Sequence, residues 1–130
     1  MKKYLALAVL VLFLCGCEVV EMAMGWHNPF VGKWMKKDGS GLTVKLRKDY
    51  VYEVDLEGDG TKDIWGTYRL PFQDEIIFKD EGGKVGIDCH QDGMYSFKFS
   101  HGDLRFYLVG DECSARREAM STAWHRKVTK

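Results

Sequence analysis

Residues 93–109 read Gly-Met-Tyr-Ser-Phe-Lys-Phe-Ser-His-Gly-Asp-Leu-Arg-Phe-Tyr-Leu-Val. Large apolar side chains alternate with other residues on both sides of Ser100-His-Gly-Asp103, a segment of turn-forming residues. Alternation with a period of two, carried by aromatic and β-branched residues, is typical of half-buried β-strands. The stretch therefore predicts an antiparallel hairpin, with strands at 93–100 and 103–109 and one buried face.

The same alternation recurs along most of the chain, and segments that contain Gly, or Pro and Asp, separate the alternating runs. The other expected strands are 31–36, 42–47, 50–56, 63–70, 75–79 and 122–128, with a further short extended piece near 84–89. Residues 111–120 break the pattern. They carry helix formers behind Asp111, which can serve as an N-cap, and they predict one short helix.

Eight short antiparallel strands leave two open edges unless the sheet closes on itself. We therefore predict an all-β, eight-stranded, up-and-down antiparallel β-barrel with one short helix before the last strand; a sandwich is the alternative. A barrel of this size is either filled by side chains or holds one small ligand. The inward-facing candidates are bulky, which favours a narrow cavity or none: Tyr50, Tyr52, Tyr68, Phe78, Tyr95, Phe97, Phe99 and Phe106.

Several short motifs carry a resemblance to a known family. They are Gly32-Lys33-Trp34, Gly66-Thr-Tyr68, Gly93-Met-Tyr95, Asp111-x-Cys113-x-x-Arg116-Arg117 and Trp124-His125-Arg126. Over residues 31–128 the chain resembles small bacterial lipocalin-like (calycin) lipoproteins. The resemblance implies that Trp34 packs across the barrel floor against Arg126, with Gly32 and Trp124 in the same closing motifs. The chain is shorter than the larger lipocalins and has briefer loops, which argues against a wide calyx.

The first seventeen residues predict export and lipidation. Lys2 and Lys3 precede an apolar run that is too short for a permanent membrane span, which needs about 20 residues. Leu14-Cys15-Gly16-Cys17 resembles a lipobox. We expect a signal peptide at 1–16, a lipid on Cys17, a tether at 17–30 and a barrel domain at 31–130. Glu18 after the lipidated cysteine indicates the outer membrane of a bacterial cell envelope, with the barrel facing the periplasm.

The net charge limits the expected binding partners, and the cysteine content predicts a cross-link. Without residues 1–16 the chain has 17 basic and 19 acidic side chains, so no strong field draws it to nucleic acid, and the membrane contact is expected through the lipid alone. Cys89 and Cys113 then remain in a compartment where disulfides persist. We expect a disulfide between them; two buried free thiols are the alternative.

The polar residues offer no catalytic, metal or cofactor motif. Asp55-x-Glu57-x-Asp59-Gly60-x-x-Asp63 resembles half of an acidic calcium loop, but Gly66 stands where the bidentate glutamate belongs. We interpret the segment as a hairpin with solvated acids. The histidines have no zinc spacing and are expected at the surface: His27, His90, His101 and His125. We therefore expect no catalytic residues, no metal, no cofactor and no enzyme.

Two functions remain as hypotheses. The first is binding of a small hydrophobic ligand at the open end of the barrel; the candidate ligand-facing residues are Tyr52, Tyr68, Tyr95, Phe97 and Phe106. The second is a non-catalytic protein-interaction, inhibitor or structural role in the envelope, with a filled barrel. A continuous interior cavity above about 300 Å³ would favour the first, and a packed interior the second.

Overall fold

The computed structural model describes residues 28–127. The predicted signal peptide at 1–16, the lipid site Cys17 and most of the tether lie outside the described residues. Within 28–127, no helix is long and apolar enough to cross a membrane.

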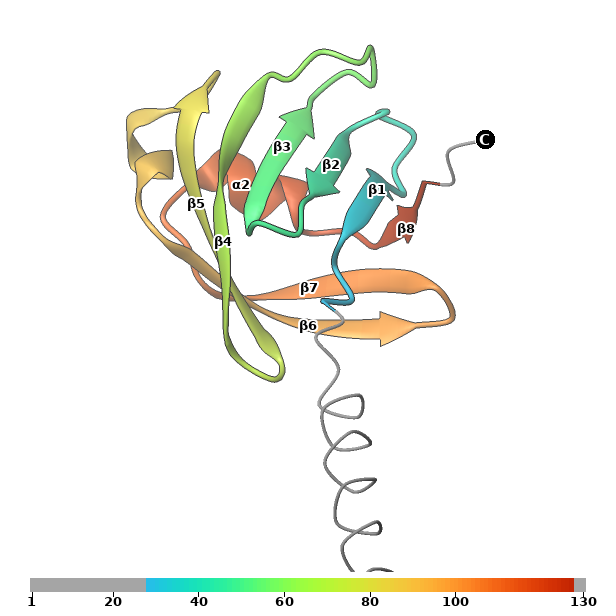
Figure 1. Ribbon diagram of the computed structural model, residues 1–130. Helices are drawn as coiled ribbons and strands as arrows, with labels where there is room; N and C mark the ends of the chain where they lie inside the picture. Colours follow the sequence, from blue (N-terminus) through green and yellow to red (C-terminus); the bar gives the residue numbers. More distant parts are fainter. Residues whose placement is uncertain (1–27, 128–130) are drawn as a thin grey trace, which may run out of the picture.

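The described chain is a closed antiparallel barrel with the strand order β1-β2-β3-β4-β5-β6-β7-β8 (Figure 1). The predicted fold class is confirmed, and the sandwich is excluded because β1 pairs with β8. The strands are β1 (Gly32–Lys36), β2 (Thr43–Leu46), β3 (Val51–Asp55), β4 (Ile64–Phe72), β5 (Glu75–Gly83), β6 (Gly93–Ser100), β7 (Asp103–Gly110) and β8 (Trp124–Arg126).

The described part of the chain also has two short helices, and for each of them one expectation is wrong. Helix α2 (Ser114–Ala119) lies before β8 as predicted, but its N-cap is Cys113 rather than Asp111. The segment near 84–89 is not simply extended, because a 3₁₀ helix, η1 (Ile87–His90), occupies its second half.

The alternating apolar positions form the core, since in a strand every second side chain faces the barrel interior. The buried apolar side chains are Phe30, Trp34, Leu42, Leu46, Tyr52, Tyr68, Ile76, Phe78, Tyr95, Leu104, Phe106, Met120 and Trp124. One predicted inward residue is wrong: Tyr50 is 50% exposed and has a positive φ of 63° in the turn before β3. Phe99 is 37% exposed near the end of β6, but its ring faces inward and packs against the buried rings of Phe30 and Trp34.

The up-and-down topology gives the barrel two different ends. The tight β2–β3, β4–β5 and β6–β7 turns share one end with the start of β1, and the longer loops share the other end with η1 and α2 (Figure 1). Residues 28–30, predicted as tether, belong to the first end: Phe30 is fully buried, and Asn28 Nδ2 donates to Tyr68 Oη at 2.7 Å. We call this end the closed end and the other the open end.

Candidate binding cavity at the open end

The closed end is built around Trp34. Its Nε1 donates to the carbonyl of Phe30 at 2.8 Å, and the Arg126 guanidinium lies 4.4 Å from the centroid of its ring. Arg126 also donates to the carbonyls of Val31 and Pro29, at 2.8 and 2.9 Å. Gly32 has a φ of +138°, and a Cβ there would lie 2.6 Å from Arg126 Nη1. Glycine is therefore required beside this arginine.

We expect Arg126→Met to lower the free energy of unfolding by about 1–2 kcal/mol, because it removes a cation–π contact and two hydrogen bonds to main-chain carbonyls. Urea unfolding monitored by tryptophan fluorescence measures the change. The matched control is Arg105→Met, at an exposed arginine of β7, which should change stability by less than about 0.5 kcal/mol. Equal losses in the two variants would contradict a closing role for Arg126.

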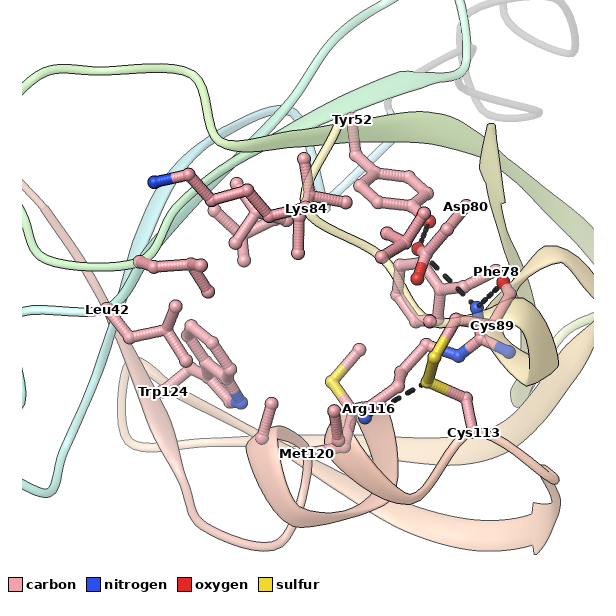
Figure 2. Close-up of a pocket in the computed structure, with 18 residues that line it drawn as sticks. Leu42, Tyr52, Phe78, Asp80, Lys84, Cys89, Cys113, Arg116, Met120 and Trp124 are labelled. Carbon is pink, nitrogen blue, oxygen red and sulfur yellow. Dashed lines mark hydrogen bonds and ion pairs between the residues drawn. A yellow bond between two sulfur atoms is a disulfide. The ribbon is translucent and has the colours of Figure 1, made fainter. Parts of the chain in front are cut away.

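At the open end the barrel encloses a cavity of about 120 Å³ (Figure 2). Strands β2, β3 and β4 form one wall, and α2 forms the opposite one. Its apolar lining includes Leu42, Val44, Val54, Ile64, Ala115, Ala119, Met120 and Trp124. Tyr52, Asp80, Lys84 and Arg116 add polar groups. The cavity is therefore an apolar space with polar groups concentrated around Asp80 and Arg116.

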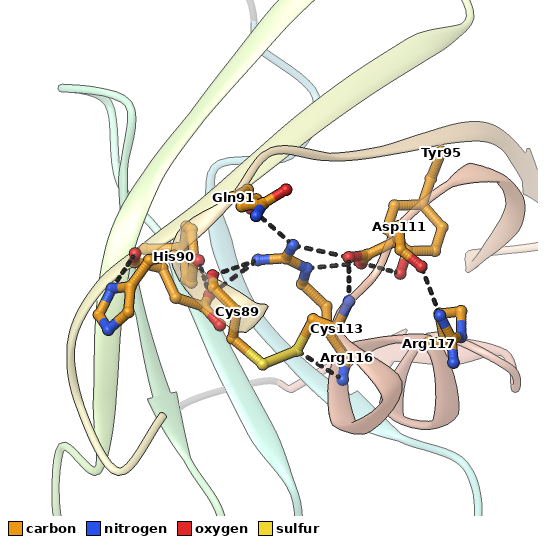
Figure 3. Close-up of a disulfide and its surroundings, with 10 residues drawn as sticks. Cys89, His90, Gln91, Tyr95, Asp111, Cys113, Arg116 and Arg117 are labelled. Carbon is orange, nitrogen blue, oxygen red and sulfur yellow. Dashed lines mark hydrogen bonds and ion pairs between the residues drawn. A yellow bond between two sulfur atoms is a disulfide. The ribbon is translucent and has the colours of Figure 1, made fainter. Parts of the chain in front are cut away.

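Arg116 of α2 points into the molecule and organises this polar side (Figure 3). Its Nε and Nη2 hold both carboxylate oxygens of Asp111, at 2.6 and 2.7 Å. The remaining donors reach the carbonyls of Cys89 and Gln91, at 3.2 and 2.9 Å, and Asp80 Oδ1 at 3.4 Å. Such bidentate, charge-assisted contacts are among the strongest polar interactions in proteins.

Asp111 is the carboxylate that neutralises Arg116. Its side chain is fully buried and also accepts from the Tyr95 hydroxyl and from the Cys113 N–H. Burial by itself would raise the pKa of Asp111, but the hydrogen bonds from Arg116 and Tyr95 outweigh it and hold the pKa below its usual value. Burial, with the hydrogen bond to Asp111, raises the pKa of Tyr95 well above its usual value.

Gly93 leaves the space for this pair. A Cβ at Gly93 would lie 2.8 Å from Arg116 Nε and closer still to the Asp111 carboxylate. The start of β6 can therefore pass directly beside the Asp111–Arg116 pair only because the residue there has no side chain.

Asp80 forms the polar wall of the cavity itself. Its side chain is 8% exposed, and its Oδ1 accepts from the hydroxyl of Tyr52, which reaches over Gly66 of the intervening strand β4. Burial raises the pKa of Tyr52 far above its usual value, and the nearby Asp80 carboxylate raises it further. Tyr52 is therefore a fixed neutral donor to Asp80.

The two cysteines lie beside this network. Cys89 in η1 and Cys113 before α2 are joined as a disulfide, with a Cα–Cα distance of 4.6 Å (Figure 3). The predicted proximity of the pair is confirmed. Cys113 Sγ also accepts from the N–H of Arg116 at 3.3 Å. The bridge thus pins η1 and the start of α2 together on either side of the Arg116 guanidinium.

The five candidate ligand-facing residues do not gather at one cavity. Only Tyr52 lines the open-end cavity. Tyr68 bonds to Asn28 and to the carbonyl of Arg47 near the closed end, and Tyr95 is committed to Asp111. The other two are packed among aromatic rings. The ring centroids of Phe97 and Phe30 are 4.6 Å apart, and those of Phe106 and Phe78 are 5.8 Å apart. Most of the predicted ligand surface is therefore core.

Two further expectations are corrected. Trp124, which the resemblance groups with the barrel-closing residues, pairs with Lys36 at the open-end side of the β1–β8 ladder and lines the cavity. The sequence predicts Arg116 and Arg117 as helix-surface or capping groups; Arg116 is instead buried, whereas Arg117 is exposed and donates to the carbonyl of Asp111 at 2.6 Å.

The acidic segment between β3 and β4 is a hairpin loop, as the sequence predicts. The carboxylates of Asp55 and Asp63 accept hydrogen bonds from main-chain N–H groups of this loop. Asp55 accepts from the N–H groups of Gly58, Asp59 and Gly60, at 2.7 to 3.2 Å. Asp63 is buried rather than solvated: it accepts from the N–H of Leu56 and pairs with Lys84 at 3.1 Å. These contacts give the acids a structural role in the loop.

The sequence did not predict that Asp80 and Arg116 lie together at the polar side of the cavity. A signal for Asp80 exists, since it follows Ile76 and Phe78 at a spacing of two and so continues the inward face of β5. No comparable signal exists for Arg116, because a six-residue helix is too short for its buried face to show in the sequence pattern.

We compared the chain with family models, with curated proteins and with solved structures, and none of these comparisons found a match.

Proposed function

We propose that the protein is an envelope-anchored lipoprotein whose lipocalin-like barrel binds a small hydrophobic ligand in the open-end cavity. The observation that carries the proposal is the apolar cavity of about 120 Å³ enclosed between the barrel wall and α2. Cavities with mainly apolar walls take up apolar molecules of matching size.

The size of the cavity limits the ligand. It falls below the roughly 300 Å³ typical of pockets for drug-sized molecules, so a haem or a whole fatty acid does not fit inside. An apolar cavity of about 150 Å³ binds benzene, which has six non-hydrogen atoms. We therefore propose a ligand, or a ligand end group, of about that size.

The closed end supports the lipocalin-like assignment. Trp34 at the start of β1 is covered by Arg126 of β8, beside a glycine that leaves room for the guanidinium. That is the arrangement which the resemblance to small lipocalin-like lipoproteins implies, and it leaves the opposite end of the barrel for binding.

Ligand binding is tested by thermal melting of a chain that begins at Glu18, which holds every strand of the barrel. A small apolar probe such as toluene or pentan-1-ol, present at 100 times its dissociation constant, should add about 2.7 kcal/mol of stability. The control is Ala119→Leu, because Ala119 of α2 lines the cavity and a larger side chain there fills it. The proposal fails if no probe stabilises the wild type, or if both chains respond alike.

Anchoring should depend on Cys17. We expect Cys17→Ala to abolish incorporation of labelled palmitate and to leave an uncleaved or unlipidated form in the periplasm, because Cys17 directly follows the small residue Gly16, as a lipobox requires, whereas Cys15 follows Leu14. Cys89→Ala is the matched control and should keep the label. Density fractionation of the wild type then tests the expected outer-membrane location. Persistent labelling of the Cys17→Ala chain would contradict the lipobox assignment.

A second candidate function, binding to an envelope protein, is favoured by one observation. Tyr107, Leu108 and Val109 form a run on β7 in which each side chain is about half exposed. Exposed apolar runs of this kind occur at protein interfaces. Capture of one envelope protein by the wild type but not by Leu108→Glu would support this function, and capture unaffected by the substitution would exclude this surface.

A further inference from the structure

Among residues 28–127, the negative charge of the Asp80 carboxylate is only partly balanced by a cation. Its nearest cation is Arg116, but that guanidinium is held in bidentate fashion by Asp111, and only Nη1 approaches Asp80, at 3.4 Å. The Tyr52 hydroxyl that donates to Asp80 is neutral. Figure 2 shows Asp80 turned toward the cavity, beside Arg116 and Tyr52.

Lys84, the other cation that lines the cavity, is also committed. Its Nζ lies 3.1 Å from Asp63, and its side chain is 73% exposed at the rim. Two cations therefore face three carboxylates around the cavity: Arg116 and Lys84 against Asp80, Asp111 and Asp63. One negative charge is in excess, and it belongs to Asp80. A buried charge without a partner is costly, so this wall favours a cation.

A second polar group at the cavity also lacks a partner. Trp124 lies on the opposite side of the cavity from Asp80 (Figure 2) and is 2% exposed. Its Nε1–H has no acceptor within residues 28–127. A buried donor left without an acceptor carries the full cost of its lost hydration. The cavity thus offers one carboxylate with an incompletely balanced charge at Asp80 and one unsatisfied donor at Trp124.

We propose that the open-end cavity binds a short aliphatic amine in its ammonium form, with the ammonium group against Asp80 and an oxygen acceptor at the other end against Trp124. The class of ligand is a short amino alcohol or amino ketone. This inference rests on the proposed ligand-binding function and specifies the chemistry of the ligand. The apolar walls formed by Val54, Ile64 and Ala119 contact the alkyl chain between the two polar ends.

Three probes of six non-hydrogen atoms separate these contributions by calorimetry on the chain from Glu18 onward: pentan-1-ol, pentan-1-amine and 4-aminobutan-1-ol. Wild type should bind pentan-1-amine at least 10-fold more tightly than pentan-1-ol. Asp80→Asn should make the two affinities equal without weakening the binding of pentan-1-ol. Asp59→Asn, at an exposed loop acid, should leave the preference for the amine unchanged. Trp124→Phe should weaken 4-aminobutan-1-ol about 5-fold and leave pentan-1-amine unchanged.

The outcomes distinguish this inference from the proposed function. If pentan-1-ol binds the wild type as tightly as pentan-1-amine, the amine assignment is wrong while ligand binding stands. If Trp124→Phe weakens both amines equally, the acceptor end is wrong. If none of the three probes binds, the proposed function fails as well. The amine-to-alcohol ratio of the wild type is decisive even where a variant does not fold.

Discussion

Replacement of Arg116 by methionine is expected to lower the free energy of unfolding by about 3–5 kcal/mol, because it leaves Asp111 as a buried carboxylate without its cation. Asp111 is fully buried and Arg116 only 6% exposed, so water cannot replace the lost contacts. For a domain of this size the melting temperature should fall by roughly 12–30 °C. Thermal unfolding followed by circular dichroism measures it.

The matched control is Arg117→Met. Arg117 is the exposed neighbour and donates only to the main-chain carbonyl of Asp111, so its loss should cost about 1 kcal/mol or less. If the two arginine variants melt at the same temperature, the buried network is not what holds the open end together.

The Arg116→Met effect should also depend on pH in a defined direction. In the wild type the pKa of Asp111 is below its usual value, so its contribution to stability is present above about pH 4 and is lost as pH falls through the folded-state pKa. In the variant, burial without Arg116 raises that pKa, and protonation relieves the unpaired charge. The stability gap between wild type and variant should therefore be largest near pH 7 and narrow toward pH 3.

Reduction of the Cys89–Cys113 disulfide should have the second-largest effect. The bridge closes a segment with a sequence separation of 24, and the entropy gained by the unfolded chain corresponds to a loss of about 3 kcal/mol. The strands should persist, because their ladder pairs β1 through β8 without either cysteine. Melting with and without reductant, with far-ultraviolet circular dichroism below the transition, measures both expectations.

Two variants separate the bridge from the helix cap. Cys89→Ala should lose the bridge alone and should no longer respond to reductant. Cys113→Ala should lose the bridge and also the acceptor for the Arg116 N–H, an additional loss of about 1 kcal/mol. A Cys89→Ala chain as stable as the oxidised wild type would show that the cross-link contributes nothing.

Much of the fold could be predicted because a strand in a closed barrel has one interior face. Tyr95 and Phe97 stand two residues apart, as do Leu104 and Phe106, and this periodicity is visible without any knowledge of the neighbouring strands. Closure followed from the need to pair both edges. The expectation failed at Tyr50, which keeps the spacing of Tyr52 but lies in the turn before β3 with a positive φ, so its side chain is half exposed.

The candidate site was predicted less well. Apolar spacing located Tyr52 on the inner face, but it could not separate a cavity wall from a filled core, so Tyr68, Phe97 and Phe106 were grouped with it. Asp111 was expected to cap the helix, and instead its carboxylate binds Arg116, five residues away. An aspartate near a helix start can hydrogen-bond either to nearby main-chain groups or to a distant side chain. Which of the two forms depends on burial, and the local sequence pattern does not show burial.

Residue patterns along the chain were enough to predict the antiparallel barrel, the inner face of most strand positions, the short helix before the last strand and the proximity of Cys89 and Cys113. Each follows from periodicity, turn chemistry or the small number of cysteines, all of which are local or countable. Three properties became visible only in the folded chain: Arg116 turns inward, the charge of Asp80 is only partly balanced by Arg116, and Trp124 faces a cavity. These properties depend on distances between β5, α2 and β8, which are set by the closure of the barrel.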